Sequence, residues 1–593
     1  MTYTAPIEDL LFALTHFGDL DALVADGLAE GVDPDLVRAL LEEGGRFAAG
    51  RMAPADAVGD RVGCRLENGR VIMPDGWQAL YADWIAGGWN GVDLPADVGG
   101  MGLPTLISSA IYQLWAGSNF GFAVGPVLTQ GVAEVLIAHG APELQAGYVE
   151  KLVSGEWTGT MALTEPQAGS DLGALTTKAV PAGDGSYRLK GQKIFITYGA
   201  HDLTDQIIHL VLARLPDAPA GTRGISLFLV PQMLPDAAGA LTIRNDVACA
   251  GIEHKLGLHA SPTCALSFGE GEGAIGWLVG APHKGLAPMF TMMNKARLAT
   301  GTQAISIADQ AYRQALDFAL TRRQGRPEGA PAGTPIAAHP DVARMLLDMR
   351  VKVTAVRAIA CLAADAIDRA HRSADAGTRE VAEARAALLT PIVKAFSSDT
   401  GVDVASTAIQ VHGGMGFVEE TGIAQRLRDV RITPIYEGTN GIQAIDLVTR
   451  KVLKAGGPEA RRLIGEAVAR AEALSCEPAV YGRAGRHLAT GAAALSEAID
   501  WLADPSRTPV ELLAGATAFL RLFGLVLGGS LLAKGALEAR VLMAGGDTRP
   551  VLAEAVVNAR FYGEQLLPEA PALRDRMTGG AETIAEAARA FAA

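Results

Sequence analysis

The stretch YRLKGQKIFIT, residues 187–197, decides the fold, because it predicts a β-strand in a chain whose other patterns are mainly helical. Gly, Pro and Asp separate it from similar runs rich in β-branched and aromatic residues: WTGTMALT (157–164), QIIHLVLAR (206–214), ISLFLVP (225–231) and CALSF (264–268). Runs of this kind are typical of strands. Together they predict one β-domain over residues 157–282.

Helical periodicity flanks this β-block on both sides. A helical lead-in is predicted over residues 1–34, where Asp33-Pro34 places an N-cap before a proline at the first helical position. A helical domain is predicted over 35–156, with an ordered Gly- and Pro-rich loop at Trp89–Pro104. Amphipathic segments over 283–454 predict a helical bundle, and the Ala/Leu-rich residues 455–593 predict an extra helical domain.

The predicted fold class is therefore mostly α with a central β-domain. Strands gathered in one block argue against a doubly wound α/β sheet. No GxGxxG fingerprint follows a strand, so a dinucleotide would have to bind without a Rossmann fold.

Composition and charge exclude several function classes. A net charge of −14 argues against nucleic acid as the main partner. The five cysteines form no CxxC pair, which indicates a reducing compartment and no disulfides. No two histidines have the HExxH spacing, so we expect no bound metal. The start of the chain lacks a signal-peptide pattern, and the apolar stretch Leu522–Ala533 is too short to span a bilayer. We therefore expect a cytoplasmic protein without membrane insertion.

Three motifs stand in a fixed order along the chain: ALTEPQAGSD (162–171), GQKIFITYG (191–199), and QVHGGMGF (410–417) followed by RDVRITPIYEGTNGIQ (428–443). In this order they resemble the acyl-CoA dehydrogenase family over about residues 35–454. The resemblance implies a helical domain, a β-barrel-like domain and a four-helix bundle. The full length resembles a longer subgroup of the family that includes enzymes acting on 3-methylmercaptopropionyl-CoA. Residues 245–269 are similar to the same stretch of those enzymes.

The resemblance implies FAD-dependent α,β-dehydrogenation of an acyl-CoA thioester to the trans-2-enoyl-CoA. Glu437 would remove the α-proton while flavin N5 takes the β-hydride. A carboxylate suits this role when desolvation raises its pKa toward the working pH. The backbone N–H of Glu437 would also polarise the thioester carbonyl, as in an oxyanion hole. Without the resemblance, Glu437 would be interpreted as a surface glutamate in a turn.

The first two motifs are expected to bind the flavin. Thr197 would hydrogen-bond N5, and Phe195 stands where many family members have tryptophan. Without the resemblance these residues predict only a capped turn and an ordinary strand. The expected FAD contacts from these motifs are Met161, Leu163, Thr164, Gly169, Ser170, Phe195, Ile196 and Thr197.

A further group is expected to bind FAD from the helical bundle. Arg322, with Arg323 as a rival, would contact the FAD of a neighbouring subunit. Glycines would let the backbone approach the FAD pyrophosphate. FAD shared in this way implies a homo-oligomer, at least a dimer. The remaining expected FAD contacts are Gln410, Gly413, Gly414, Thr439 and Gly441.

Substrate contacts are expected from Ser170, Asn294, Arg297 and Gly438, although many relatives have aspartate at position 294. The family implies an electron-transfer flavoprotein as acceptor. The alternatives are a dehydrogenase of short, medium or long acyl chains and an acyl-CoA oxidase with the same base. A DNA-associated flavoprotein would need a basic C-terminal surface, and a non-catalytic CoA-binding module would have lost Glu437. The domain over 455–593 carries no motif with assignable chemistry, and we expect it to serve packing and a dimer interface.

Overall fold

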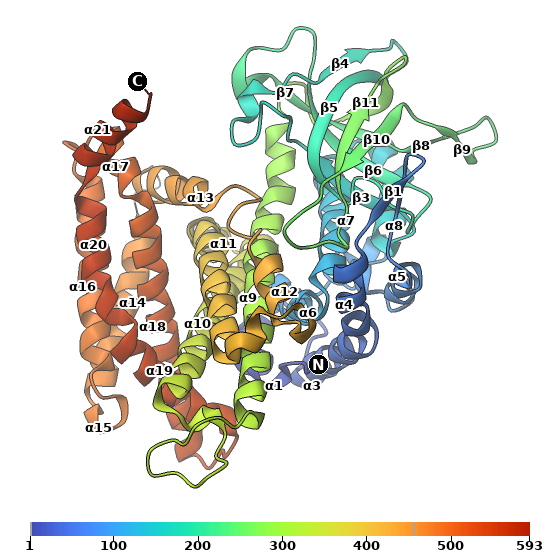
Figure 1. Ribbon diagram of the computed structural model, residues 1–593. Coiled ribbons are helices and arrows are strands. Elements are labelled where there is room, and N and C mark those ends of the chain that lie inside the picture. Colours follow the sequence, from blue (N-terminus) through green and yellow to red (C-terminus); the bar gives the residue numbers. More distant parts are fainter. Residues whose placement is uncertain (1–2, 455–456, 593) are drawn as a thin grey trace.

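The computed structural model describes residues 3–454 and 457–592. It confirms the predicted order of a helical part, a β-domain, a helical bundle and an additional helical domain (Figure 1). The β-domain and the additional helices lie on opposite sides of the bundle.

The N-terminal part is helical apart from one hairpin. The Asp33 carboxylate accepts a hydrogen bond from the Leu36 N–H at 2.8 Å, so the predicted cap is present. The stretch Trp89–Pro104 is a loop with two short 3₁₀ turns. The sequence-based prediction missed the hairpin, in which Asn68 and Gly69 both have positive φ. The elements are α1 (Ile7–His16), α2 (Leu20–Ala25), α3 (Pro34–Phe47), η1 (Ala48–Met52), α4 (Ala53–Val62), β1 (Arg65–Glu67), β2 (Arg70–Ile72), α5 (Trp77–Ala86), η2 (Trp89–Gly91), η3 (Ala96–Val98), α6 (Thr105–Ser118), α7 (Phe120–His139) and α8 (Pro142–Ser154).

The β-domain is built on one eight-stranded sheet, with strand order β10-β11-β5-β12-β7-β6-β3 and with β4 paired to β5 and β6. Its interior is a separate apolar cluster that includes Leu189, Phe228 and Phe268. The long strand β5 pairs with β4, β11 and β12, so it joins the two halves of the sheet. The elements are β3 (Thr158–Ala162), η4 (Leu172–Ala174), β4 (Lys178–Pro181), β5 (Tyr187–Thr197), β6 (Ile207–Arg214), η5 (Gly221–Gly224), β7 (Ile225–Pro231), β8 (Met233–Pro235), β9 (Leu241–Arg244), β10 (Val247–Ile252), β11 (Thr263–Phe268) and β12 (Ala274–Val279).

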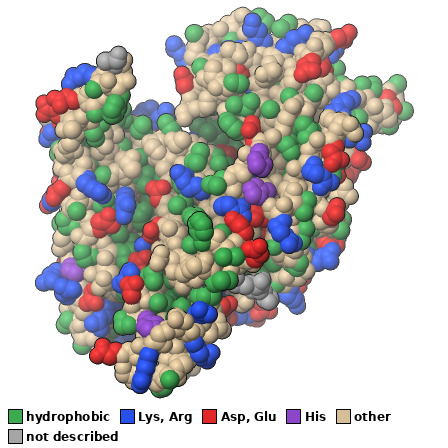
Figure 2. Space-filling view, in the orientation of Figure 1, with side chains coloured by type: hydrophobic (Ala, Val, Ile, Leu, Met, Phe, Trp, Pro, Cys, Tyr) green, Lys and Arg blue, Asp and Glu red, His purple; other side chains and the backbone are tan. Residues whose placement is uncertain are grey.

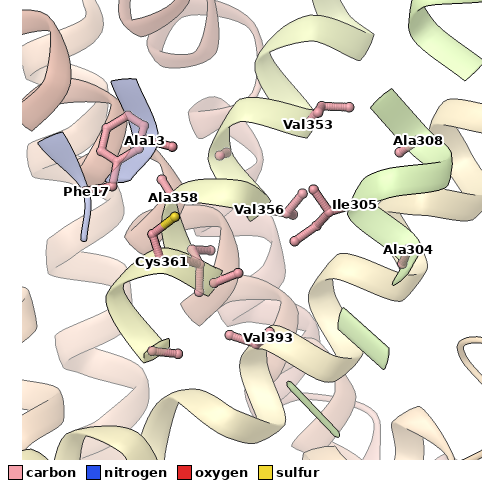
Figure 3. Packing of buried hydrophobic residues seen from close by; sticks show 14 of the residues in the cluster. Ala13, Phe17, Ala304, Ile305, Ala308, Val353, Val356, Ala358, Cys361 and Val393 are labelled. Atoms are coloured by element: carbon pink, nitrogen blue, oxygen red, sulfur yellow. The ribbon is translucent and has the colours of Figure 1, made fainter. Parts of the chain in front are cut away.

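Three long helices form the bundle, and aliphatic side chains fill its core. Ile305 of α9, Val356 of α10 and Val393 of α11 meet in its core (Figure 3). Gly301 lets α9 and α11 approach closely, because a Cβ there would fall 2.5 Å from Val393 Cγ1. The elements are α9 (Leu286–Thr321), η6 (Ile336–Ala338), α10 (Pro340–Arg372), α11 (Ala376–His412), η7 (Gly413–Phe417), η8 (Glu419–Thr421), α12 (Ile423–Val430), α13 (Asn440–Asp446) and η9 (Leu447–Leu453).

The additional domain is all helical, and the predicted breaks near residues 476–478 and 504–509 are present. The predicted buried helix over Leu522–Ala533 lies within α18. Among the described residues, two helices, α7 and α18, are long and apolar enough to span a membrane, but 83% of the most apolar window of each is buried inside the protein. The elements are α14 (Pro458–Ser475), α15 (Pro478–Tyr481), α16 (Ala484–Ala503), α17 (Pro509–Ala514), α18 (Ala516–Ala544), α19 (Pro550–Gln565), η10 (Leu567–Glu569), α20 (Ala570–Thr578) and α21 (Ala581–Ala592).

The two ends of the chain pack against each other. His16 of α1 hydrogen-bonds Glu538 of α18 at 2.8 Å, and Lys534 of the same helix pairs with Asp19 at 2.9 Å. The Phe17 ring lies against Gly535, where a Cβ would fall 2.7 Å from it. The predicted lead-in is therefore docked on the additional domain and on the bundle (Figure 3).

Candidate active site

A buried ion pair joins the first two sequence motifs. Lys193 of β5 and Glu165, in the turn after β3, lie 2.8 Å apart with side chains 0% and 2% exposed. Glu165 also accepts hydrogen bonds from the backbone N–H and hydroxyl groups of Thr176 and Thr177. Burial raises the pKa of Glu165, but Lys193 and these hydrogen bonds outweigh it and hold the pKa at about 2. The turn 164–170 is therefore fixed against β5.

A β-bulge in β5 turns Phe195 outward. Ile196 pairs with Cys264 and Lys193 with Leu266, so two residues of β5 stand opposite a single residue of β11. Phe195 has φ +58 and its side chain is 59% exposed, which is unusual for a large apolar residue in a strand. Ile196 is buried in the β-domain core, which leaves only its backbone for contact with a ligand. The bulge thus presents an aromatic face on the surface.

Glu437 sits in a strained loop between α12 and α13. Its φ is +55, a conformation that few non-glycine residues adopt and that costs about 1–3 kcal/mol. The loop is held from both sides: the Asn440 N–H donates to the Pro434 carbonyl at 3.0 Å, and buried Gln443 donates to the Glu437 carbonyl at 3.1 Å. Gly438 follows with φ +82, and a Cβ there would fall 2.8 Å from Gln443 Nε2. Strain of this kind is typical of functional sites.

The surroundings of Glu437 favour a carboxylate that titrates near neutral pH. Burial raises its pKa to about 7, although the nearby charges of Arg297 and Lys394 oppose this rise. Arg297 lies on α9 and its buried Nε has no hydrogen-bond partner among the described residues. Within residues 3–454 and 457–592, the Glu437 backbone N–H also makes no hydrogen bond. A base with a free neighbouring donor can remove a proton beside a polarised carbonyl.

A cavity of about 760 Å³ opens between α7, α9, α10 and α11. Asn294 and Arg297 both line it, as does Asp446 at the end of α13. Its wall is charged where Lys295 bridges Asp93 at 2.8 Å and Glu134 at 2.5 Å. The volume is in the range of small-molecule and cofactor sites. The space-filling view shows a deep notch between the β-domain and the tip of the additional domain, near which α13 lies (Figure 2).

A second group of predicted residues lies at the other end of the bundle. Arg322 caps α9, and a rise of about 1.5 Å per residue puts it about 37 Å from Arg297. Phe318 stacks on His412 with ring centroids 4.5 Å apart, so the ends of α9 and α11 lie together. Gln410, Gly413 and Gly414 at the end of α11 are exposed. The end of the bundle that carries Arg322 is therefore too far from Glu437 for both to contact one small ligand within a single chain. They would meet at one site only around a large ligand, or if Arg322 came from a second copy of the chain.

The structure places each remaining predicted residue in one of these regions. Met161 and Leu163 are half-buried beside β6, and the Thr164 carbonyl accepts from the Ile194 N–H at 2.9 Å. Thr197 is half-buried at the end of β5, while Gly169 and Ser170 are exposed in the turn. Thr439 caps α13 by accepting from the Ile442 N–H.

Sequence reasoning assigned no role to four residues that shape the site. Three of them stand inside the motifs without having been given a role, and the fourth is a single lysine in an otherwise mainly apolar segment. They are Glu165, Lys193, Lys394 and Gln443.

The fold places Glu437, on a strained loop, near Arg297, which lines a cavity between helices. The chain belongs to the acyl-CoA dehydrogenase family. The models of the family's N-terminal, middle and C-terminal domains match residues 37–156, 160–270 and 283–453. A model described as acetyl-CoA dehydrogenase C-terminal like matches residues 463–588.

Relatives are similar to this chain over nearly its full length, the additional domain included. The 3-methylmercaptopropionyl-CoA dehydrogenase of Ruegeria pomeroyi is 42% identical, covering 98% of this chain and 99% of its own. The broad-specificity linear acyl-CoA dehydrogenase FadE5 of Mycobacterium tuberculosis is 33% identical over 95% of this chain and 96% of its own. The crystal structure of Caenorhabditis elegans ACDH-11 in complex with C11-CoA shares the fold, with a TM-score of 0.74 at 22% identity, covering 95% of this chain and 92% of that chain.

Proposed function

We propose that the protein binds FAD and desaturates a short acyl-CoA thioester, with Glu437 as the base. The observation that carries the proposal is the Glu437 loop. Its carboxyl is half-buried with a pKa of about 7, its backbone N–H makes no hydrogen bond among the described residues, and the neighbouring Arg297 lines the cavity. Near neutral pH such a carboxylate is matched to the removal of an α-proton.

The residues present fit FAD. Phe195 offers an exposed aromatic face on β5, beside the polar turn 164–170, and an isoalloxazine ring could cover it. Gly413 and Gly414 have no atom within 4 Å of where a Cβ would stand, so their backbone is open to a pyrophosphate. When bound, FAD would supply the hydride acceptor, N5.

The residues proposed to hold FAD fall into two groups. One chain would provide Met161, Leu163, Thr164, Gly169, Ser170, the backbone of Ile196, Thr197, Thr439 and Gly441. Because Arg322 lies far along α9 from Glu437, a neighbouring copy would provide Arg322, Gln410, Gly413 and Gly414. Arg323 is a weaker candidate, since its Nε already donates to the Gly333 carbonyl at 2.6 Å. An oligomer, at least a dimer, is thus part of the proposal.

The remaining groups act on the thioester. Arg297, Asn294 and Lys295 line the cavity, and their polar character suits the CoA moiety. The Glu437 N–H would donate to the thioester carbonyl, which stabilises negative charge as the α-proton moves to the Glu437 carboxylate. Gly438 would let the loop approach the thioester, and Ser170 would contact the CoA moiety. Electrons would then leave to an electron-transfer flavoprotein.

We propose 3-methylmercaptopropionyl-CoA as the candidate substrate, supported by the full-length similarity to the Ruegeria pomeroyi enzyme. Anaerobic visible spectra of the FAD-loaded protein, titrated with that thioester, butyryl-CoA and dodecanoyl-CoA, test it. Bleaching of the flavin by the methylmercapto substrate at the lowest concentration is expected. Preference for butyryl-CoA or dodecanoyl-CoA would refute the substrate while keeping the reaction.

The base is tested with Glu437→Gln, which should bind FAD and the thioester but reduce flavin at least about 10³-fold more slowly. Gln keeps the shape of the side chain and removes only the proton acceptor. Wild-type rates of flavin reduction in this variant would overturn the assignment.

A further inference from the structure

Lys394 is a buried lysine beside the Glu437 loop. It lies on α11 with 0% of its surface exposed, although lysines are almost never fully buried unless paired. Among the described residues it forms no ion pair, and its Nζ donates to Asn440 Oδ1 at 2.9 Å. A positive charge is thus held in the protein interior by a neutral amide.

Asn440 connects this lysine to the loop that carries Glu437. Its backbone N–H closes the loop on the Pro434 carbonyl at 3.0 Å. Its side-chain amide donates to Asp399 Oδ1 at 2.7 Å and to the Ala395 carbonyl at 3.2 Å. Asn440 therefore closes the loop 434–440 with its backbone and ties it to α11 with its side chain, whose oxygen accepts hydrogen bonds from Lys394 and from the Ser398 hydroxyl at 3.1 Å.

Among the charged groups near Lys394, Glu437 has the strongest electrostatic interaction with it. Asp399 on α11 and Arg297 on α9 are the other near charges. Burial lowers the pKa of Lys394 to about 8, so it stays mostly protonated at neutral pH. Arg297 and Asp399 have further charged neighbours of their own: Asp446 on α13 and Arg450 on η9 act on Arg297, and Arg431 after α12 and Arg521 on α18 act on Asp399.

We propose that Lys394 is a positioning residue for Glu437, because it holds the loop through Asn440 while its charge favours the ionised carboxylate. The inference rests on the proposed role of Glu437 as base. It predicts that Lys394 acts on the protonation of Glu437 and not only on the stability of α11.

The test is the pH dependence of flavin reduction by the preferred acyl-CoA, measured by anaerobic stopped flow on FAD-loaded protein. Lys394→Met removes the charge and keeps most of the volume, and Lys394→Arg keeps the charge. Lys352→Met is the matched control. It removes another lysine of the same bundle, whose ion-pair partners are Asp348 and Asp403 and not Glu437.

An opposite charge within a few ångströms lowers a carboxyl pKa by about 1–3. Lys394→Met is therefore expected to move the acidic limb of the rate profile upward by about 1 pH unit. The rate below this limb then falls about tenfold, since less Glu437 is ionised, while the limb of Lys394→Arg and of Lys352→Met stays in place.

A lower plateau with an unmoved limb in Lys394→Met would overturn the inference, because a merely structural lysine gives that result. If this variant does not fold, Asn440→Ala is the second test. It keeps the lysine but removes the side chain that ties the Glu437 loop to α11, and it should lower the plateau rate of flavin reduction at least about fivefold. An unchanged plateau would equally refute the inference. Wild-type protein that no thioester reduces would refute the proposed function instead.

Discussion

Breaking the buried Glu165–Lys193 pair is predicted to destabilise the β-domain. Removing one partner of a buried ion pair costs about 3–5 kcal/mol, since the other charge is left uncompensated. In Lys193→Met, Glu165 keeps its hydrogen bonds from Thr176 and Thr177, so we expect the lower end, about 3 kcal/mol. With an m-value of about 1–3 kcal/mol/M, this lowers the midpoint of urea unfolding by about 1 M or more.

The assay is urea unfolding at pH 7 and pH 4, followed by tryptophan fluorescence. The native pKa of Glu165, about 2, lies below its ordinary value of 4.5. The stability from the ionised carboxylate is therefore full above pH 4.5 and is lost as the pH falls toward 2. The gap between wild type and Lys193→Met should narrow at pH 4.

Two comparisons make this reasoning refutable. Lys190→Met on the same strand removes an exposed lysine and should change stability by less than about 0.5 kcal/mol. The double variant Glu165→Gln/Lys193→Met should lose less than the two single losses added together. Additive losses would show that the two side chains are not coupled.

Three further predictions concern the loop, its base and the helix packing. Flavin reduction should rise with pH through about 7 in a stopped-flow profile, because Glu437 must be ionised to accept a proton. Gly438→Ala should slow reduction at least about tenfold, since its φ of +82 and the 2.8 Å approach to Gln443 force the loop to move. Gly524→Ala should cost about 1–3 kcal/mol in urea unfolding, because its Cβ would fall 2.4 Å from the Phe396 ring.

Each of the two glycine variants has a matched control. Gly147→Ala in α8 and Gly465→Ala in α14 place a Cβ in open space, where alanine is the better helix former. Both should leave flavin reduction unchanged and stability equal or slightly raised. A pH profile that is flat from 5 to 9 would contradict the assignment of Glu437, and loss of stability in these controls would contradict the packing argument.

The order of domains could be predicted because helical periodicity gives way near residue 157 to short runs rich in β-branched and aromatic residues, and returns near residue 282. Local signals also gave the Asp33 cap and the breaks around α15. The bulge at Phe195 could not be predicted, since it depends on the pairing of β5 with β11. The hairpin β1–β2 has three-residue strands, too short for a periodic pattern.

The site was predicted only in part, for a related reason. The motif around Glu437 singled out the base, but its strained φ and its raised pKa come from the packing around it. Lys394 reads as an ordinary helical lysine, because nothing in its neighbourhood along the chain shows that Asn440, 46 residues later, meets its amine. Contacts over such separations are set by the fold as a whole.

The docking of α1 on the additional domain has a consequence for how the chain can be shortened. Phe17 and His16 need α18, and α18 in turn covers α10 and α11. Deleting either segment would expose apolar surface on the other, so each depends on the other for burial. A chain that stopped after residue 454 would therefore expose the faces of α10 and α11 that α18 covers, and we expect it to be less stable and less soluble.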